Sequence, residues 1–152
     1  MTTDDLSECP FCLIVQEHSM AEVVFESPDN IAFFPLNPAT LGHTLVVPKK
    51  HVRDLWDLES EAAKSLMDST LRVAQGLRVA LRPQGINLIN SSGSAASQTI
   101  FHLHMHLVPR WDDDRVGNIW PPKRPMEAAV RERLADEVRE GMETARRLHL
   151  PS

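Results

Sequence analysis

Three histidines alternate with apolar residues in the run His102-Leu103-His104-Met105-His106. Side chains of a β-strand alternate between its faces, so the three imidazoles would share one face and leave the apolar residues on the core side. Such a row can bind a metal ion, bind an anion, or supply a nucleophile with electrostatic helpers; a solvent-facing row without a role is the remaining alternative. Because the ordinary imidazole pKa is about 6.5, a neutral ring can attack phosphorus and carry the phosphoryl group until water releases it.

Two cysteines form a second reactive group in Cys9-Pro10-Phe11-Cys12. The two-residue gap lets both sulfurs bind one metal ion, which would need histidine partners to complete a tetrahedral site. The same spacing occurs in redox-active thiol pairs that open a helix. The spacing therefore leaves a metal site, redox chemistry and unliganded buried thiols open.

The hydrophobic pattern predicts the elements that position these groups. Helices are predicted at residues 9–17, 60–81 and 126–148. Strands are predicted at residues 23–26, 31–34, 44–47, 86–89 and 99–108, with a loop of small residues at 90–97. Antiparallel strands with segregated helices predict an α+β fold. The length fits a single domain, residues 1–152, with a core at about 9–110 and a C-terminal loop and helix at 111–152.

Composition argues against several classes of protein. The formal net charge is -5 and no block of Lys or Arg stands out, so a long nucleic acid is not the expected partner. Residues 1–8 are polar and acidic, unlike a signal peptide. No stretch approaches the roughly 18 apolar residues of a membrane span. We therefore expect a cytoplasmic protein that does not bind membranes.

The triad and its surroundings resemble the histidine triad (HIT) family. The signature of three alternating histidines followed by two apolar residues is matched by residues 102–108. Residues 25–34 and 42–51 are similar to the first half of the family's domain, and Gln98-Thr99 stands just before the triad. The resemblance covers about residues 9–110. It implies the HIT fold, an antiparallel five-stranded sheet with one long central helix, here with an additional C-terminal helix.

The resemblance also implies an activity, the hydrolysis of a nucleotide conjugate or nucleotidyl transfer at its α-phosphorus. The substrate would be a phosphoramidate or a dinucleoside polyphosphate. The catalytic residues implied are His104, which becomes covalently nucleotidylated and donates its other ring hydrogen to the carbonyl of His102, and His106, which holds the phosphate. Further phosphate contacts are implied for Ser91, Gln98 and Thr99. Nucleoside contacts are implied for Phe11, Ile14, Phe33, Leu36 and Asn37.

In the family, and in related galactose-1-phosphate uridylyltransferases, a cysteine pair of this kind joins two histidines on a structural zinc ion. The ligands implied here are Cys9, Cys12, His51 and His102. His43 is expected to be structural and bonded to the backbone. Family members form two-fold homodimers, so the resemblance implies a homodimer, with the contact along residues 60–81 and the strand that follows.

Two positions depart from the family's pattern. Pro35 stands where a side chain usually binds the ribose hydroxyls, with Asn37 close enough in sequence to substitute, and Ser91 replaces the usual amide of the phosphate loop. An alternative function is a non-catalytic, nucleotide-binding and zinc-stabilised adaptor, which would bind an adenosine 5′-phosphoramidate without turnover. A redox protein is a third function, and it would require Cys9 and Cys12 to form a reversible disulfide.

Overall fold

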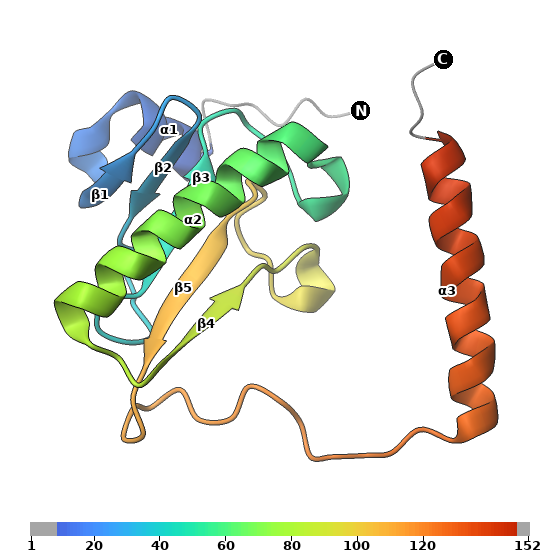
Figure 1. The fold of residues 1–152 in the computed structure, drawn as a ribbon. Helices are drawn as coiled ribbons and strands as arrows, with labels where there is room; N and C mark the ends of the chain where they lie inside the picture. The colour runs from blue at the N-terminus through green and yellow to red at the C-terminus, as the bar shows by residue number, and fades with distance from the viewer. Residues whose placement is uncertain (1–8, 149–152) are drawn as a thin grey trace. The chain divides into compact units, whose positions relative to one another are not determined.

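A computed structural model describes residues 9–148. One antiparallel sheet has the strand order β1-β2-β3-β5-β4 (Figure 1). The strands are β1 Val23–Glu26, β2 Asn30–Phe33, β3 Thr44–Pro48, β4 Gly85–Ile89 and β5 Met105–Arg110. The helices are α1 Pro10–Gln16, α2 Ser60–Leu81 and α3 Ala128–Leu148, with short 3-10 turns η1 His18–Met20, η2 Leu55–Asp57 and η3 Ser94–Ala96. The predicted α+β class and five-stranded antiparallel sheet are confirmed.

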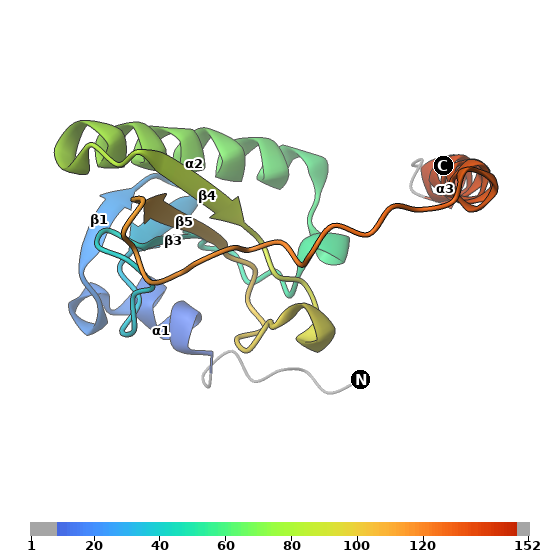
Figure 2. The same cartoon turned by 90° about the horizontal axis from the view of Figure 1, so that it is seen from below.

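Both faces of the sheet are covered, because α1 and α2 lie on opposite sides of it (Figure 2). Alternation along β2 and β3 directs Ala32 and Val46 into the cluster beneath α2. Their neighbours Ile31, Phe33 and Leu45 pack instead with Phe11 of α1. The central strands therefore consist of buried residues along their whole length.

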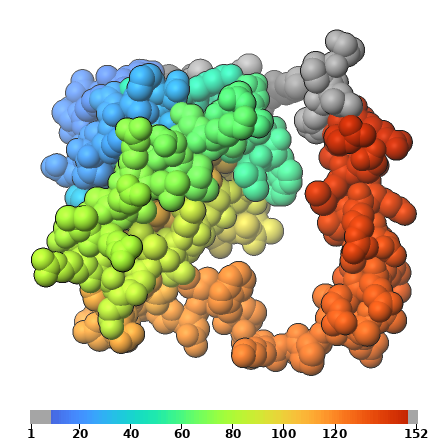
Figure 3. Space-filling view, viewed as in Figure 1, coloured from blue at the N-terminus to red at the C-terminus, as the bar shows by residue number. Residues whose placement is uncertain are grey.

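The long helix α2 has the bounds that the apolar pattern predicts, 60–81. Its buried face includes Leu66, Val73 and Leu77, and its other side forms part of the exposed surface (Figure 3). The helix ends where Arg82 takes a left-handed conformation, followed by Pro83. The leucines and valine hold α2 against the sheet, and Leu103 and Leu107 of the triad segment belong to the same cluster.

The predicted strand at 99–108 was wrong in its extent, since β5 spans only Met105–Arg110. Pairing with β3 stops at Met105, opposite Val46, and pairing with β4 stops at His106, opposite Ile89. Residues 99–104 have no neighbouring strand to pair with, and side chains and loops bind their backbone instead. Two of the three histidines therefore precede the strand.

The chain divides into two compact units at residues 117 and 118. The first contains the sheet, α1 and α2. The second contains α3, which begins at Ala128 and not at the predicted residue 126. Boundaries of the other helices and strands agree with the prediction within one residue, except for β5.

Within the described residues, no helix is long and apolar enough to cross a membrane.

Replacement of Gly42 by alanine tests the turn before β3. Gly42 has a φ of 77°, and an added Cβ would overlap Cδ1 of Leu81. We expect Gly42→Ala to lower the free energy of unfolding by about 1–2 kcal/mol, chiefly from the left-handed backbone, because the Cδ1 of Leu81 is a side-chain end that can move. Gly76→Ala is the matched control, because no atom lies within 4 Å of its added Cβ. In α2 that change should stabilise by about 0.5–1 kcal/mol. Urea denaturation measures both, and equal midpoints would contradict the expectation.

Candidate functional site

The middle histidine, His104, lies directly before β5 with its ring against Phe11 of α1, at 5.1 Å between centroids. Its Nδ1 lies 2.7 Å from the carbonyl oxygen of His102. A carbonyl only accepts, so Nδ1–H donates this bond, and in the neutral ring Nε2 carries the lone pair. Burial lowers the pKa of His104, although the bond to His102 acts in the opposite direction. The ring is therefore mostly neutral at pH 7, the form in which imidazole is nucleophilic.

Asn90, the residue after β4, is bonded to the backbone of His104. Its Nδ2 donates to the carbonyl oxygen of His104 at 3.0 Å, and its Oδ1 accepts from the hydroxyl of Ser92 at 2.8 Å. The hydroxyl oxygen of Ser92 accepts in turn from the backbone N–H of Leu55. The Asn90 amide thus joins the end of β4 to the residue that directly precedes β5. Asn90 was not predicted as a site residue, although its position at the end of a predicted strand was a usable signal.

His106 lies within β5, and its Nδ1 is 2.9 Å from Nε2 of His43. Nδ1 of His43 accepts the backbone N–H of Ala39 at 3.0 Å, which confirms the predicted backbone bond of His43. The contact with His106 was not predicted. It follows from the register, because His106 pairs with Leu45, and His43 lies two residues before Leu45 on the same side of the chain. Burial lowers the pKa of His43 and lowers that of His106 to about 4.

The residues predicted as metal ligands lie together. Their donor atoms, one each from Cys9, Cys12, His51 and His102, are all within 4.8 Å of one another. Nδ1 of His102 is 3.4 Å from Sγ of Cys9 and 3.5 Å from Sγ of Cys12, and Nδ1 of His51 is 3.3 Å from Sγ of Cys12. These separations are close to the nitrogen–sulfur edge of about 3.5 Å that a tetrahedral zinc site would have.

The protonation of these groups also fits a cation. Nε2 of His102 lies 2.8 Å from the carbonyl oxygen of Pro48 and must donate to it, so Nδ1 presents a lone pair toward the sulfurs. Burial, with a smaller contribution from Cys9, raises the pKa of Cys12 to about 11. A bound metal ion would stabilise the thiolate that burial disfavours. The four side chains could therefore hold a metal ion.

The three residues predicted to bind phosphate have different environments. Ser91 is half-buried and Thr99 is exposed, both in the segment between β4 and β5. Gln98 is buried, and its Nε2 donates to the carbonyl oxygens of Arg53 and Ile100. Its Oε1 accepts from the backbone N–H of Gly93. In this structure the Gln98 amide joins the loop between β4 and β5 to the segment that follows the possible metal ligand His51.

The residues predicted to bind the nucleoside fall into two groups. Phe11, Ile14 and Phe33 belong to one apolar cluster, and Phe11 contacts the rings of both His102 and His104. Leu36 and Asn37 lie on the loop after β2, where Leu36 is 95% exposed. The structure thus brings Phe11 to the triad, with Ile14 and Phe33 in the same cluster, and leaves the side chains of the loop residues in solvent.

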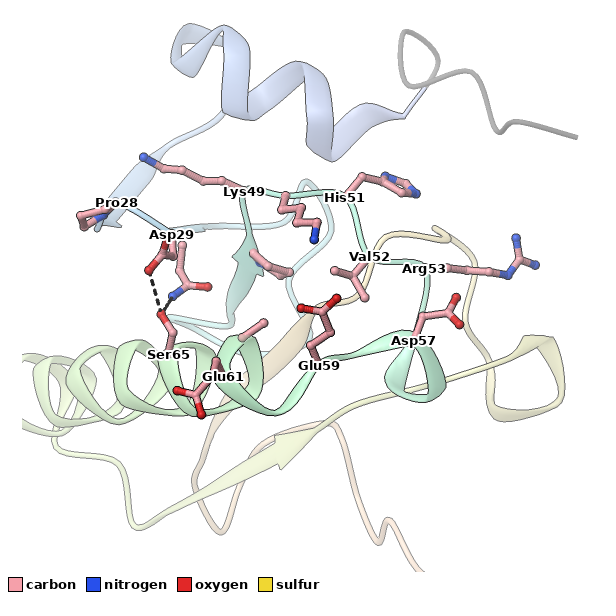
Figure 4. Close-up of a pocket in the computed structure, with 14 residues that line it drawn as sticks. Pro28, Asp29, Lys49, His51, Val52, Arg53, Asp57, Glu59, Glu61 and Ser65 are labelled. Carbon is pink, nitrogen blue, oxygen red and sulfur yellow. Dashed lines mark hydrogen bonds between the residues drawn. The ribbon is translucent and has the colours of Figure 1, made fainter. Parts of the chain in front are cut away.

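A cavity of about 710 Å³ lies between residues 48–53 and the start of α2. Its basic residues include Lys49 and Arg53, and its acidic residues include Glu59 and Glu61 (Figure 4). His51 also lines it, but His104 and His106 do not. This cavity is therefore separate from the triad. Within the triad, His106 is partly exposed, whereas His102 and His104 are buried.

The fold and the triad define a histidine-triad domain, and comparisons with known proteins agree. The HIT domain profile matches residues 16–113. The structure of SMU.412c from Streptococcus mutans UA159 has a TM-score of 0.86 and 32% identity, covering 93% of this chain and 90% of that chain. A Zn-bound histidine triad family protein from Mycobacterium smegmatis has a TM-score of 0.69 and 35% identity, with coverages of 78% and 86%.

A third structure, a HIT family hydrolase from Legionella pneumophila Philadelphia 1, has a TM-score of 0.61 and 30% identity. It covers 76% of this chain and 99% of that chain. The chain belongs to the HIT domain family. The resemblance carried by the triad sequence is thereby confirmed.

We expect the cysteine–histidine group to bind one metal ion per chain. Addition of Co²⁺ to chelator-treated protein should produce the visible absorption of a tetrahedral, thiolate-ligated ion. Cys12→Ser and His51→Asn should abolish that spectrum because each removes a ligand. His18→Asn is the matched control, since His18 is exposed and outside the group. A protein that takes up no Co²⁺ while both thiols react freely would contradict the expectation.

Proposed function

We propose that this protein is a nucleotide hydrolase or nucleotidyl transferase acting at the α-phosphorus of a nucleotide conjugate. The conjugate would be a phosphoramidate or a dinucleoside polyphosphate, and the reaction would pass through a nucleotidyl intermediate on His104. The observation that carries the proposal is the bond from Nδ1–H of His104 to the carbonyl of His102, which leaves Nε2 as a lone-pair nucleophile. Membership of the HIT family supports it, as does the family neighbour named a hydrolase.

The reaction has two displacements. Nε2 of His104 attacks the α-phosphorus, and the bond to the amine or polyphosphate breaks with its electron pair leaving on that group. Water then attacks the phosphorus of nucleotidyl-His104, the P–N bond breaks, and mononucleotide is released. A hydroxyl or phosphate acceptor in place of water would give nucleotidyl transfer. In both steps the carbonyl of His102 stabilises the positive charge that develops on the His104 ring.

The groups around His104 suit the charge that develops on the phosphate. His106 is adjacent, with 4.8 Å between the two ring centroids, and we assign it the phosphate oxygens. Ser91 and Thr99 can add hydroxyl donors, and Gln98 contributes through the loop that it holds. The nucleoside would pack against Phe11, Ile14 and Phe33, with Leu36 and Asn37 closing over it from the loop.

We assign a structural zinc ion to Cys9, Cys12, His51 and His102. Two sulfurs and two imidazole nitrogens are the donor set that tetrahedral zinc prefers, and four protein ligands leave no position for a reactive water. The relative from Mycobacterium smegmatis is described as Zn-bound. When bound, zinc would supply folding energy and fix the position of His102.

We also propose a homodimer that buries the β4 side of the sheet. β4 is an edge strand, and Ile86 and Leu88 on one of its faces are 42% and 44% exposed. Leu88 pairs with Leu107, which packs under α2, so this face of β4 lies on the α2 side. Met67 and Leu71 of α2 are also exposed. A second copy would cover both the apolar side chains and the open strand edge.

If His104 is the nucleophile, His104→Asn should abolish turnover without abolishing nucleotide binding. The asparagine amide can still donate to the carbonyl of His102 but cannot form a phosphoramidate. Turnover of an adenosine 5′-phosphoramidate should fall by at least about 10⁴-fold, the order lost when a nucleophile is removed, while mononucleotide binding persists. His106→Asn should cost about 100- to 1,000-fold, the effect of one lost oxyanion donor. His18→Asn makes the same substitution at an exposed histidine and should have no effect.

The covalent step can be detected by quenching enzyme and labelled substrate in base and mapping the labelled peptide. Label on residue 104 is expected, and label elsewhere or near-normal turnover by His104→Asn would overturn the mechanism. If the wild-type protein binds nucleotides but turns over no conjugate in a panel followed for mononucleotide release, the adaptor is the correct function.

If the protein is a homodimer, light scattering at micromolar concentration should give twice the mass of one chain. Leu71→Glu should shift the mass toward the monomer, because it places a charge in the proposed contact. Met20→Glu is the control: Met20 is 54% exposed and Leu71 is 55% exposed, but Met20 lies in η1, outside α2 and β4. A monomeric wild type, or dissociation by Met20→Glu alone, would rule out this interface.

A further inference from the structure

We propose that His43 is a positioning residue that holds His106 in the tautomer with its hydrogen on Nε2. In that tautomer His106 offers a donor to a phosphate oxygen. The consequence for turnover rests on the function proposed above. The tautomer itself is a property of the free protein and can be measured without any substrate.

The direction of the hydrogen bonds fixes both rings. The backbone N–H of Ala39 donates to Nδ1 of His43, so that nitrogen carries no hydrogen. A neutral imidazole then has its hydrogen on Nε2, which lies 2.9 Å from Nδ1 of His106. His43 must donate this bond and Nδ1 of His106 must accept it. The hydrogen of His106 is therefore on Nε2, on the side of the ring away from His43.

A protonated His43 does not fit the same geometry. Its second hydrogen would lie on Nδ1 and point at the N–H of Ala39, placing two donors against each other. Burial also disfavours the charged form, and it lowers the pKa of both His43 and His106. The pair is therefore neutral, and one backbone amide determines the tautomer of both rings.

The amide of Ala39 is held in place by a closed turn. The backbone N–H of His43 donates to the carbonyl oxygen of Thr40 at 3.1 Å, and the hydroxyl of Thr40 donates to the carbonyl oxygen of Pro109 at 2.7 Å. Gly42 supplies the left-handed residue of this turn. Pro109 and His106 both belong to β5, so the chain of contacts starts and ends on the strand that carries His106.

The tautomer decides whether His106 attracts or repels a phosphate oxygen. With hydrogen on Nε2, the ring donates to the oxygen as negative charge develops in the transition state. With hydrogen on Nδ1, Nε2 would present a lone pair to the same oxygen. A row of histidines alone does not specify which ring nitrogen carries the hydrogen. In His106, the hydrogen bond from His43 selects the tautomer with hydrogen on Nε2.

The tautomer can be read from the ring-nitrogen shifts of ¹⁵N-histidine-labelled protein in two-bond ¹H–¹⁵N spectra near pH 7, with His106→Asn used to assign the signals. In the wild type, Nε2 of His106 should show the shift of a protonated nitrogen and Nδ1 that of a bare one. His43→Leu removes the donor at similar volume. It should give His106 a mixture of tautomers or the opposite one.

His43→Gln is the conservative rescue, because its amide can donate to His106. It should restore the wild-type spectrum. With adenosine 5′-phosphoramidate as the probe, His43→Leu should lower kcat by about 10- to 100-fold and change KM less. The loss in kcat should be smaller than that expected when an oxyanion donor is removed altogether, because His106 itself is still present. His43→Gln should regain most of that loss. His18→Leu is the control at an exposed histidine, and circular dichroism checks that each variant is folded.

Hydrogen on Nδ1 of His106 in the wild type would overturn the proposal. So would an unchanged His106 spectrum in folded His43→Leu, because His43 would then not select the tautomer. If the spectra agree but kcat of His43→Leu equals that of the wild type, the positioning role is wrong. Failure of the proposed function would look different, since the wild type would turn over no nucleotide conjugate while the spectra still decide the tautomer.

Discussion

The site depends on the position of His102, a fully buried residue that makes three different contacts. Its Nδ1 faces the two cysteine sulfurs, its Nε2 donates to the carbonyl of Pro48, and its own carbonyl accepts from the ring of His104. A shift of this one residue would disturb the possible metal site, the end of β3 and the ring of His104 together. The cysteine pair and the histidine triad, which are distant in sequence, are therefore parts of one structural unit.

Residues that carry reactive groups in short motifs could be identified from the sequence. The alternating histidines and the Cys9–Cys12 pair are local patterns, and the structure places His51 and His102 beside that pair as the family resemblance implied. The long helix was also predictable, because α2 presents one apolar face at helical spacing over 22 residues. In each case the signal lies in the spacing of neighbouring residues.

Features that depend on pairing between distant segments were not predictable. Alternation continues through residues 99–104, but the neighbouring strands end too soon to pair with them, so the strand was predicted too long. The contact of His43 with His106 requires the register of β3 against β5. The family resemblance predicts that Gln98 contacts phosphate, yet its side-chain amide is bonded to the backbone of two loops. Sequence alone specifies none of these partners.

Pairing of β5 with β3 and β4 ends at Met105 and His106, so residues 98–104 lack strand neighbours. Residues 98–104 are joined to their surroundings by side-chain bonds, such as Asn90 to His104, and by the backbone bond from Leu103 to Val52. They lie outside the hydrogen-bonded ladder of the sheet, but Leu103 is fully buried in the cluster beneath α2, so opening of this segment would also expose part of the core. His104 thus lies between the hydrogen-bonded strands and a segment that is held by core packing and by bonds to loops. Protection of the backbone amides of this segment from hydrogen exchange therefore depends on packing in the core and not on strand pairing.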